Sequence, residues 1–328
     1  MKESSRRWIA LAFGAALLLG AQPDASAAEF SFKVAHTNAP GEIQDQGVLQ
    51  FKSRLEELTN GRATLENFPN GQLGAELPAV QSVLLGTVDM TVPGNAAFSN
   101  FVPHFRVFDF PFLFRDPAHF EGVVSGAVFE ELRTAAAARG FRLLGIFNSG
   151  TRHIMTKSPV NSISDLKNKK IRTVQNPIHV EAFKAFGANA TPLAYNELYG
   201  ALQAGVVDGA DAANTNYWAQ KFYEVAPNWA LVSWLIYTAP VVMSEKTFQG
   251  LPKDIQAALE KAGAESATWQ RQLAGKSEGP LLEQIKAKGV QVTAPDREPF
   301  RKASEALYDK MLTKPEEKSL LATIQHAK

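Results

Sequence analysis

The 328-residue sequence contains no cysteine, and several other chemical signatures are missing with it. Without cysteine there are no disulfide bonds, no thiol nucleophile and no lipid attached through a cysteine side chain. The six histidines stand apart, without the paired spacing of a metal site. Phosphate-binding loops, dinucleotide-binding motifs, nucleophile elbows and zinc-protease motifs do not occur either. These absences favour a protein that is not an enzyme and holds no cofactor or metal, although missing motifs alone do not disprove catalysis.

The chain also lacks an excess of charge and a long apolar run. Its 34 Lys and Arg residues nearly balance 33 Asp and Glu residues, so the formal net charge is +1. This composition gives no electrostatic footprint for nucleic acid or for an anionic lipid surface. The longest apolar run, Trp8 to Leu19, is shorter than the roughly 20 residues that a membrane-spanning helix needs.

Residues 1–28 have the layout of a secretory signal peptide. A basic start, Lys2 to Arg7, precedes the apolar run, and the small residues Ala25 to Ala28 follow it. We expect cleavage after Ala27 or Ala28, with a retained N-terminal anchor as the alternative. Because no cysteine can carry a lipid, the mature chain is expected to be free in the periplasm.

Predicted strands and helices alternate in the first part of the mature chain. Strands are indicated by apolar residues at every second position, and helices by apolar residues three or four positions apart. Asn60-Gly61 and Gly86 end the two predicted helices. This order predicts a parallel sheet with helices on its faces. The predicted strands are 30–35, 63–68 and 88–92, and the predicted helices contain apolar positions from 48 to 58 and from 77 to 84.

The same order returns later in the chain, which favours two similar α/β lobes rather than one large sheet. The run Gly86 to Asp89 has a local echo in Gly205 to Asp208. A helix with apolar positions from 255 to 273 would extend about 30 Å, enough to lie across two lobes. We expect lobe I to comprise residues 29–149 and 238–277, and lobe II residues 150–237 and 278–328. The later predicted strands are 143–147, 170–174, 206–208 and 290–292, and the later helices lie near 180–187, 197–204 and 307–312.

Several short motifs extend over nearly the whole mature chain. They are FPNGQLG at 68–74, GTVDM at 86–90, GTRH at 150–153, DLKNKKIR at 165–172, GANATPL at 187–193, NELYGALQAGVVDG at 196–209 and KFYEV at 221–225. In this order and spacing they resemble the DctP-type substrate-binding proteins that serve tripartite ATP-independent periplasmic (TRAP) transporters. The resemblance implies a two-lobed clamp like that of periplasmic binding proteins, each lobe a mostly parallel sheet flanked by helices, that closes on a small carboxylate.

The resemblance places the carboxylate anchor at Arg172. In the family, an arginine at this place forms a bidentate salt bridge with the ligand, and a guanidinium fork matches the two oxygens of a carboxylate. A surface salt bridge is the alternative role for Arg172. Arg152 is either a second ligand contact or a brace that pairs with a carboxylate from the other lobe. Tyr195 stands where the family has an aromatic residue that packs on the ligand, with a place in the core as the alternative.

Further positions from the first lobe align with ligand contacts of the family, which vary there. They are Thr37, Glu76 and Asn95. Glu76 and Asn95 suit hydroxyl groups rather than a second carboxylate, because a carboxylate side chain repels another anion.

The second lobe departs from the common family pattern. Where Gln-Glu-Asn usually follows Asp-Gly, this chain has Ala210-Asp211-Ala212. Asp211 can keep the acidic role, and Asn214 can replace the missing amide, with Asn216 as a similar candidate. These departures leave the anchor at Arg172 intact and concern the far half of the ligand.

The function that the resemblance implies is the capture of a small organic acid, a sugar acid or hydroxy acid, by closure of the lobes. The closed protein would then deliver the ligand to the small and large membrane subunits of a TRAP permease. A ligand-presenting partner of a membrane sensor and a periplasmic enzyme are the alternatives. The chain has no extended heptad that would support an interface, so we expect a monomer.

Overall fold

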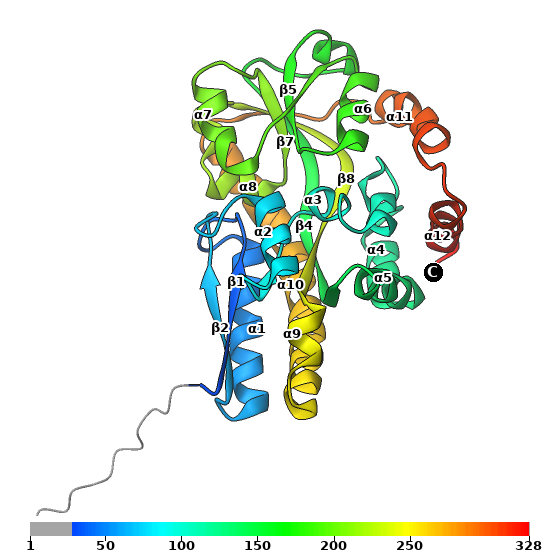
Figure 1. The fold of residues 1–328 in the computed structure, drawn as a ribbon. Helices are drawn as coiled ribbons and strands as arrows, with labels where there is room; N and C mark the ends of the chain where they lie inside the picture. The colour runs from blue at the N-terminus through cyan, green and yellow to red at the C-terminus, as the bar shows by residue number, and fades with distance from the viewer. Residues whose placement is uncertain (1–27, 328) are drawn as a thin grey trace, which may run out of the picture.

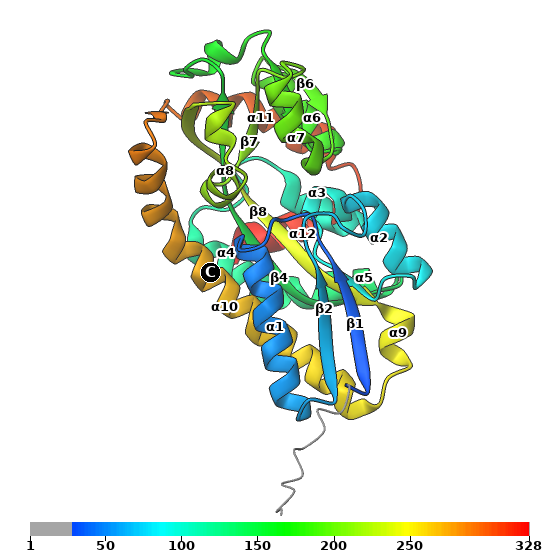
Figure 2. The same cartoon turned by 90° about the vertical axis from the view of Figure 1, so that its left-hand side faces the viewer.

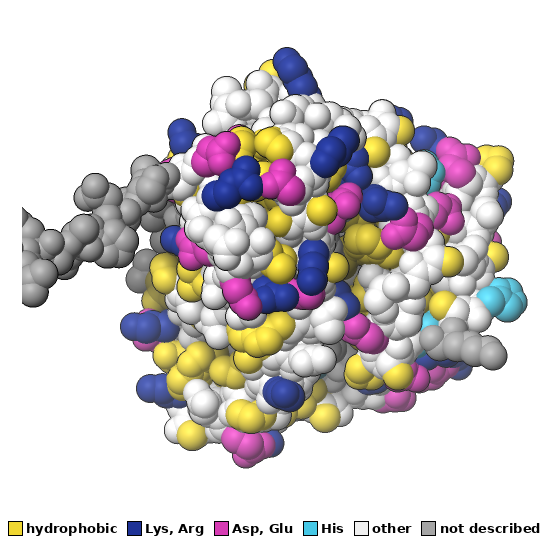
Figure 3. All heavy atoms as spheres, turned by 90° about the horizontal axis from the view of Figure 1, so that it is seen from below, with side chains coloured by type: hydrophobic (Ala, Val, Ile, Leu, Met, Phe, Trp, Pro, Cys, Tyr) yellow, Lys and Arg dark blue, Asp and Glu magenta, His cyan; other side chains and the backbone are white. Residues whose placement is uncertain are grey.

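The computed structural model describes residues 28–327, and all but the last residue of the predicted signal peptide, 1–28, lie outside the described residues. Figure 1 shows two α/β units, one above the other, with long elements that run between them. Within residues 28–327, no helix is long and apolar enough to cross a membrane. The face seen in Figure 3 carries basic and acidic side chains side by side, in keeping with the balanced composition.

The first unit is a parallel three-stranded arrangement with two connecting helices. Its elements are β1 (Phe30–Ala35), α1 (Ile43–Thr59), β2 (Ala63–Phe68), α2 (Glu76–Leu85) and β3 (Met90–Thr91). Strand β1 lies between β2 and β3 and runs parallel to both. Asn60 ends α1 in the left-handed conformation, at φ 51°, and Gly86 ends α2 at φ 76°. The predicted order is confirmed, with β3 shorter than expected.

The second unit repeats the first. Its elements are β5 (Lys170–Thr173), α6 (Pro177–Ala185), β6 (Asn189–Pro192), α7 (Leu198–Gln203), β7 (Gly209–Ala212) and α8 (Asn214–Ala219). Strand β5 lies between β6 and β7 and is parallel to both. The strand expected at 206–208 starts slightly later, at Gly209.

The similar segments Gly86 to Asp89 and Gly205 to Asp208 form the same hydrogen bond in both units. The Asp89 carboxylate accepts a 2.8 Å hydrogen bond from the backbone N–H of Lys33 in β1. In the second unit, the Asp208 carboxylate accepts a 2.8 Å bond from the backbone N–H of Lys170 in β5. Each aspartate therefore ties the start of the third strand of its unit to the first strand.

Two long strands join the units. They are β4 (Phe141–Thr156) and β8 (Asn228–Ser244), of 16 and 17 residues, and they pair with each other in antiparallel orientation. Within residues 28–327 the strands form one nine-stranded mixed sheet, in the order β2-β1-β3-β8-β4-β7-β5-β6 with β9 (Gln291–Thr293) beside β8. The α/β class and the parallel pairing within each unit are confirmed. The expectation that the lobes do not share one large sheet is wrong, because β4 and β8 continue through both.

Helix α10 (Lys253–Ala287) also spans both units, as predicted, but it is much longer than expected. Its 35 residues correspond to about 52 Å of helix, and it continues through Pro280. Figure 2 shows α10 beside α1 in the first unit. The boundaries expected at 149/150, 237/238 and 277/278 thus fall inside β4, β8 and α10, and the division into lobes stays a prediction.

A helical layer follows β3 and covers the first unit. It comprises α3 (Asn95–Phe98), the 3-10 helix η1 (Pro103–Asp109), α4 (Pro117–Ser125) and α5 (Ala127–Ala137), and the short α9 (Glu245–Gln249) follows β8. Buried aromatic rings hold this layer together: Phe98 meets Phe105 edge to face at 4.8 Å and Phe141 of β4 at 5.0 Å.

The C-terminal helices divide between the two units. Helix α11 (Glu298–Met311) packs against α6, whereas α12 (Pro315–His326) packs against η1 and α5. Glu317 of α12 is fully buried and accepts a 2.8 Å hydrogen bond from Arg106 of η1. The end of the chain, expected in lobe II, therefore returns to the first unit.

Candidate functional site

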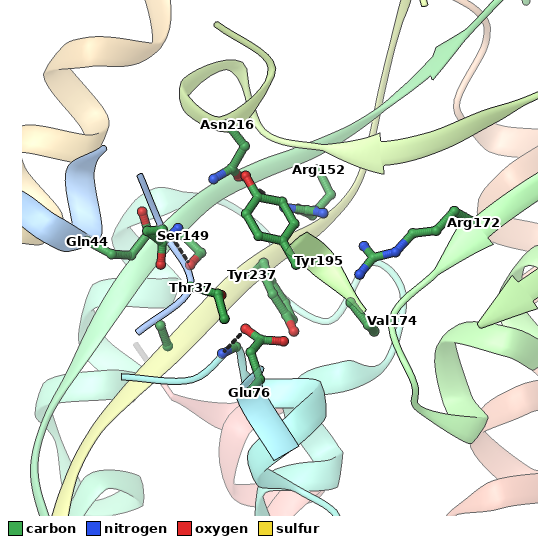
Figure 4. Close-up of a pocket in the computed structure, with 13 residues that line it drawn as sticks. Thr37, Gln44, Glu76, Ser149, Arg152, Arg172, Val174, Tyr195, Asn216 and Tyr237 are labelled. Carbon is green, nitrogen blue, oxygen red and sulfur yellow. Dashed lines mark hydrogen bonds between the residues drawn. The ribbon is translucent and has the colours of Figure 1, made fainter. Parts of the chain in front are cut away.

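A pocket with an empty volume of about 390 Å³ lies where the two units meet at β4 and β8 (Figure 4). The first unit and the loops beside it, the second unit, and the two crossing strands all contribute to its wall. The lining residues are Thr37, Asn38, Gln44, Glu76, Gly94, Ser149, Arg152, Arg172, Val174, Tyr195, Asn216, Tyr237 and Ala239. The structure thus brings together five of the eight predicted site residues: Thr37, Glu76, Arg152, Arg172 and Tyr195.

Arg172 is a buried cation without an acidic partner in the described part of the chain. It belongs to β5, is 1% exposed, and its Nε donates a 2.9 Å hydrogen bond to the carbonyl of Leu193. Among residues 28–327, no carboxylate lies within ion-pair distance of Arg172, and its Nη1 has no hydrogen-bond partner. Burial lowers the pKa of the guanidinium, although the charges of Asp211 and Glu76 act in the opposite direction. The alternative of a surface salt bridge is wrong, and the arrangement suits an anion that enters the pocket.

Arg152 of β4 is buried like Arg172, but it is fully paired. Its Nε donates to Asp211 Oδ2 at 2.8 Å, and its other nitrogens donate to the Asp211 carbonyl at 2.8 Å and to Asn216 Oδ1 at 3.2 Å. Burial acts to lower the pKa of Arg152, but the charge and hydrogen bond of Asp211 outweigh it and the pKa is raised. Asp211 therefore serves as the partner of Arg152 and does not line the pocket.

Two tyrosines form aromatic walls of the pocket. Tyr195 begins the 3-10 turn η3 (Tyr195–Glu197), is only partly buried, and packs edge to face on Phe222 at 6.2 Å. Tyr237 of β8 faces the Arg152 guanidinium at 5.1 Å and accepts a 3.2 Å hydrogen bond from the Ala96 N–H. A side chain at Gly94 would come within 2.4 Å of the Tyr237 hydroxyl, so the close approach requires glycine there.

Glu76 and Thr37 supply oxygen atoms from the first unit. Glu76 is the first residue of α2, and its Oε1 accepts a 2.8 Å hydrogen bond from the Gly94 N–H. Its position at the positive end of a helix and this bond stabilise a carboxylate in the pocket wall. Thr37, which is buried, follows β1 at the same end of the sheet.

Asn95 and Asn214 are not brought to the pocket. The Asn95 amide donates to Asp109 Oδ1 at 2.8 Å and to the Phe105 carbonyl at 2.9 Å. The Asn214 amide donates to Glu278 Oε2 at 2.7 Å, and its oxygen accepts from Trp229 Nε1 at 2.9 Å. Both side chains bind neighbouring elements instead, and we do not retain them as ligand contacts.

Gln44, Ser149, Asn38 and Tyr237 line the pocket although the sequence reasoning did not select them. Ser149 directly precedes the GTRH motif, which was the one signal that could have found it. Gln44 lies in the first turn of α1 and carries no local signal, because an amide at a helix start is ordinary. The described residues also contain no group of three or more His, Asp or Glu side chains placed to hold a metal ion.

Clamp-like binding proteins for small anions have a two-unit fold and a pocket between the units. This chain has both features, and the arginine in its pocket has no acidic partner among residues 28–327. The family described as bacterial extracellular solute-binding protein, family 7 (DctP), matches residues 34–315, and this chain belongs to it.

Individual relatives agree with this assignment. A solute-binding protein of Verminephrobacter eiseniae is 34% identical over 268 residues, 81% of this chain and 80% of the relative. The 2,3-diketo-L-gulonate-binding periplasmic protein YiaO of Escherichia coli is 31% identical over 287 residues, 87% of this chain and 88% of YiaO. The crystal structure of a TRAP periplasmic solute-binding protein from Xanthobacter autotrophicus, with bound β-D-galacturonate, has a TM-score of 0.88 and 31% identity over 90% of this chain and all of that one. The predicted resemblance to TRAP solute-binding proteins is thus confirmed.

Proposed function

We propose that this protein captures a hydroxylated organic acid between its two units and delivers it to a TRAP permease. The observation that carries the proposal is the Arg172 guanidinium, which is buried, directed into the pocket and free of any acidic partner among residues 28–327. A ligand carboxylate supplies the missing counter-charge and can accept two parallel hydrogen bonds. Tyr195, Thr37 and Glu76 complete the contacts that we propose.

The rest of the pocket favours hydroxyl groups beside that carboxylate. Its polar lining consists mainly of uncharged amides and hydroxyls, and the second arginine, Arg152, is already paired with Asp211. Glu76 can accept hydrogen bonds from ligand hydroxyls but would repel a second carboxylate. Among the similar proteins, β-D-galacturonate and 2,3-diketo-L-gulonate are ligands with this combination of groups.

Contacts across the pocket support capture by closure. Glu42, which precedes α1 in the first unit, is buried and accepts hydrogen bonds from Asn216 at 2.6 Å and Gln220 at 2.8 Å, both of the second unit. Burial raises the pKa of the Glu42 carboxyl despite these bonds. We propose that these hydrogen bonds of Glu42 form when the lobes close. We also propose that β4, β8 and α10 bend where they cross between the lobes.

The location and the partners of the protein follow from the same assignment. We propose export through the signal peptide 1–28, a periplasmic location and a monomeric state. The small and large membrane subunits of the permease are the expected partners, and no reaction is expected at the site. Relatives that are named as periplasmic binding proteins support this setting.

A thermal-shift screen tests the function. The protein without residues 1–28 is heated with uronic acids, aldonic acids, short hydroxy acids, dicarboxylic acids and the matching neutral sugars. A ligand at 100 times its dissociation constant adds about 2.7 kcal/mol to the free energy of unfolding, which raises the melting temperature visibly. We expect shifts with hydroxylated monocarboxylic acids and none with neutral sugars. If neutral sugars bind as well as their acids, the anchoring role of Arg172 is wrong. The protein is unfolded and refolded before the screen, because this step removes any ligand that co-purifies with it.

A further inference from the structure

Gln44 and Ser149 face each other at the end of the pocket away from Arg172 (Figure 4). Gln44 comes from the first turn of α1 and Ser149 from the middle of β4. Both are almost completely buried, at 2% and 3% exposure. The Gln44 amide donates to the Ser149 hydroxyl oxygen, and Gln44 Oε1 has no hydrogen-bond partner among the described residues.

This pair offers one donor and one acceptor to the pocket. As placed, Gln44 Oε1 accepts, and the Ser149 hydroxyl, whose oxygen already accepts from Gln44, can donate its hydrogen. If the amide is turned over, its nitrogen is the free donor and the serine oxygen the free acceptor. In both arrangements the pair is uncharged and matches an alcohol, which itself donates and accepts.

The surrounding structure holds both side chains in place. An added side chain at Gly47 would lie 2.6 Å from the Phe147 ring, so the start of α1 can only approach β4 this closely with glycine there. Gln270 of α10 accepts from the Asn148 N–H and donates to the Asn148 carbonyl, both at 2.8 Å. Beyond Asn148 the pairing of β4 with β8 shifts by one residue, with Gly150 at φ 87°, and Ser149 lies in this bulge.

We propose that Gln44 and Ser149 form a hydroxyl-reading subsite that selects acids long enough to reach it from Arg172. The proposal rests on the proposed function, since it takes Arg172 as the carboxylate anchor. A buried amide and hydroxyl raise the affinity for a ligand that forms hydrogen bonds with them and lower it for a ligand that leaves them unpaired. The preferred substrates are therefore polyhydroxylated monocarboxylic acids. Short hydroxy acids leave the subsite unpaired, and dicarboxylic acids find no free cation there, because Arg152 pairs with Asp211.

Calorimetric titration with aldonic acids of three to six carbons tests the subsite. For the wild type we expect affinity to rise steeply at the chain length whose hydroxyl first reaches Gln44 and Ser149. Ser149→Ala and Gln44→Met each remove one partner, which lowers the affinity for these long acids by about 5- to 150-fold. The shorter acids, which do not reach the subsite, should change less than twofold. Ser304→Ala is the matched control, because Ser304 is as buried as Ser149 but, among the described residues, its hydroxyl bonds only to the Arg301 carbonyl of its own helix.

Two results with the variants would overturn the subsite alone. Equal losses for short and long acids would mean that Gln44 and Ser149 only support the fold, and unchanged affinity for long acids would mean that they do not meet the ligand. A wild type that binds no acid of the series would instead refute the proposed function, and the subsite with it. Retained affinity in Arg172→Ala would separately refute the anchor.

Discussion

Asp211 pairs with Arg152 and leaves Arg172 unpaired, although both guanidinium groups line the same pocket. The Arg152 Nε lies 2.8 Å from Asp211 Oδ2, whereas the side chain of Arg172 donates, among the residues that the structure describes, only to the Leu193 carbonyl. The Asp211 carboxylate, which lies behind the pocket wall, is thus used by Arg152, and the positive charge of Arg172 is available to a ligand.

Arg172→Ala should abolish acid binding without unfolding the protein. The expected loss is about a hundredfold or more, the usual size when one partner of a buried, hydrogen-bonded charge pair is removed. The ligand-free protein should be at least as stable as the wild type, because an unpaired buried charge opposes folding. Titration calorimetry and the melting temperature of the free protein measure the two effects. Arg133→Ala, at a half-exposed arginine of α5 whose side chain is 39% exposed and outside the pocket, is the control. Binding within a few-fold of the wild type would contradict the anchor.

Asp211→Asn should destabilise the fold at neutral pH by about 3–5 kcal/mol, because it leaves the buried Arg152 without a counter-charge. Burial acts to raise the pKa of Asp211, but the charge of Arg152 outweighs it and holds the pKa below the ordinary value of 3.8. The stability that the pair contributes is therefore present above pH 3.8 and is lost as the pH falls below it. Urea unfolding at pH 7 and pH 3 should show a large difference from the wild type at pH 7 and a smaller one at pH 3. A constant difference would contradict the ion pair.

The first unit could be predicted because its signals are local. Alternation of apolar residues, helical spacing and the turn residue Asn60 all lie within one element, and β1 and β2 match the prediction residue for residue. Strand β8 was missed because Asn228–Ser244 is buried on both faces and so shows no alternation. The shared sheet depends on this strand and could not be seen without it.

The residues of the pocket could likewise be predicted only in part from the sequence. Arg172 could be identified from its place in the family motif, and the residue before it, Ile171, already indicated a buried strand. Position alone does not give the direction of a side chain. Asn214 and Asn216 are two residues apart on α8, about 200° of rotation, so only Asn216 reaches the pocket. Gln44 and Ser149 meet across 105 positions of sequence, a contact that no local pattern contains.

Tyr195→Ala should weaken acid binding by about 2 kcal/mol, roughly thirtyfold, because a partly buried aromatic wall of the pocket is lost. Tyr195→Phe keeps the ring and should cost only about 1 kcal/mol, roughly fivefold. Selectivity among acids that differ in hydroxyl configuration should narrow in both variants. Titration of each variant with a set of epimeric sugar acids measures this. Unchanged affinity in Tyr195→Ala would assign the residue to the core.

His153 should make the fold sensitive to mild acid. It is buried in β4 directly after Arg152, and burial, with smaller contributions from the charges of Arg152 and Arg297, lowers its pKa from 6.5 to about 3. Its Nδ1 accepts a 3.1 Å hydrogen bond from the Ser233 N–H, which also requires the neutral ring.

Since the unfolded chain binds the His153 proton first, the stability contribution is complete above pH 6.5 and is lost as the pH falls toward 3. The free energy of unfolding should drop by up to about 1.4 kcal/mol per pH unit in this window. His153→Asn keeps an acceptor for the Ser233 N–H and removes the titrating ring. The variant should be less stable than the wild type at pH 7, but its free energy of unfolding should change less between pH 6.5 and pH 4. Asp211 titrates below this range and does not affect the comparison. Urea unfolding of both proteins across this range measures the slope. Equal slopes would show that other groups control the acid response and that His153 does not remain neutral for the reason given.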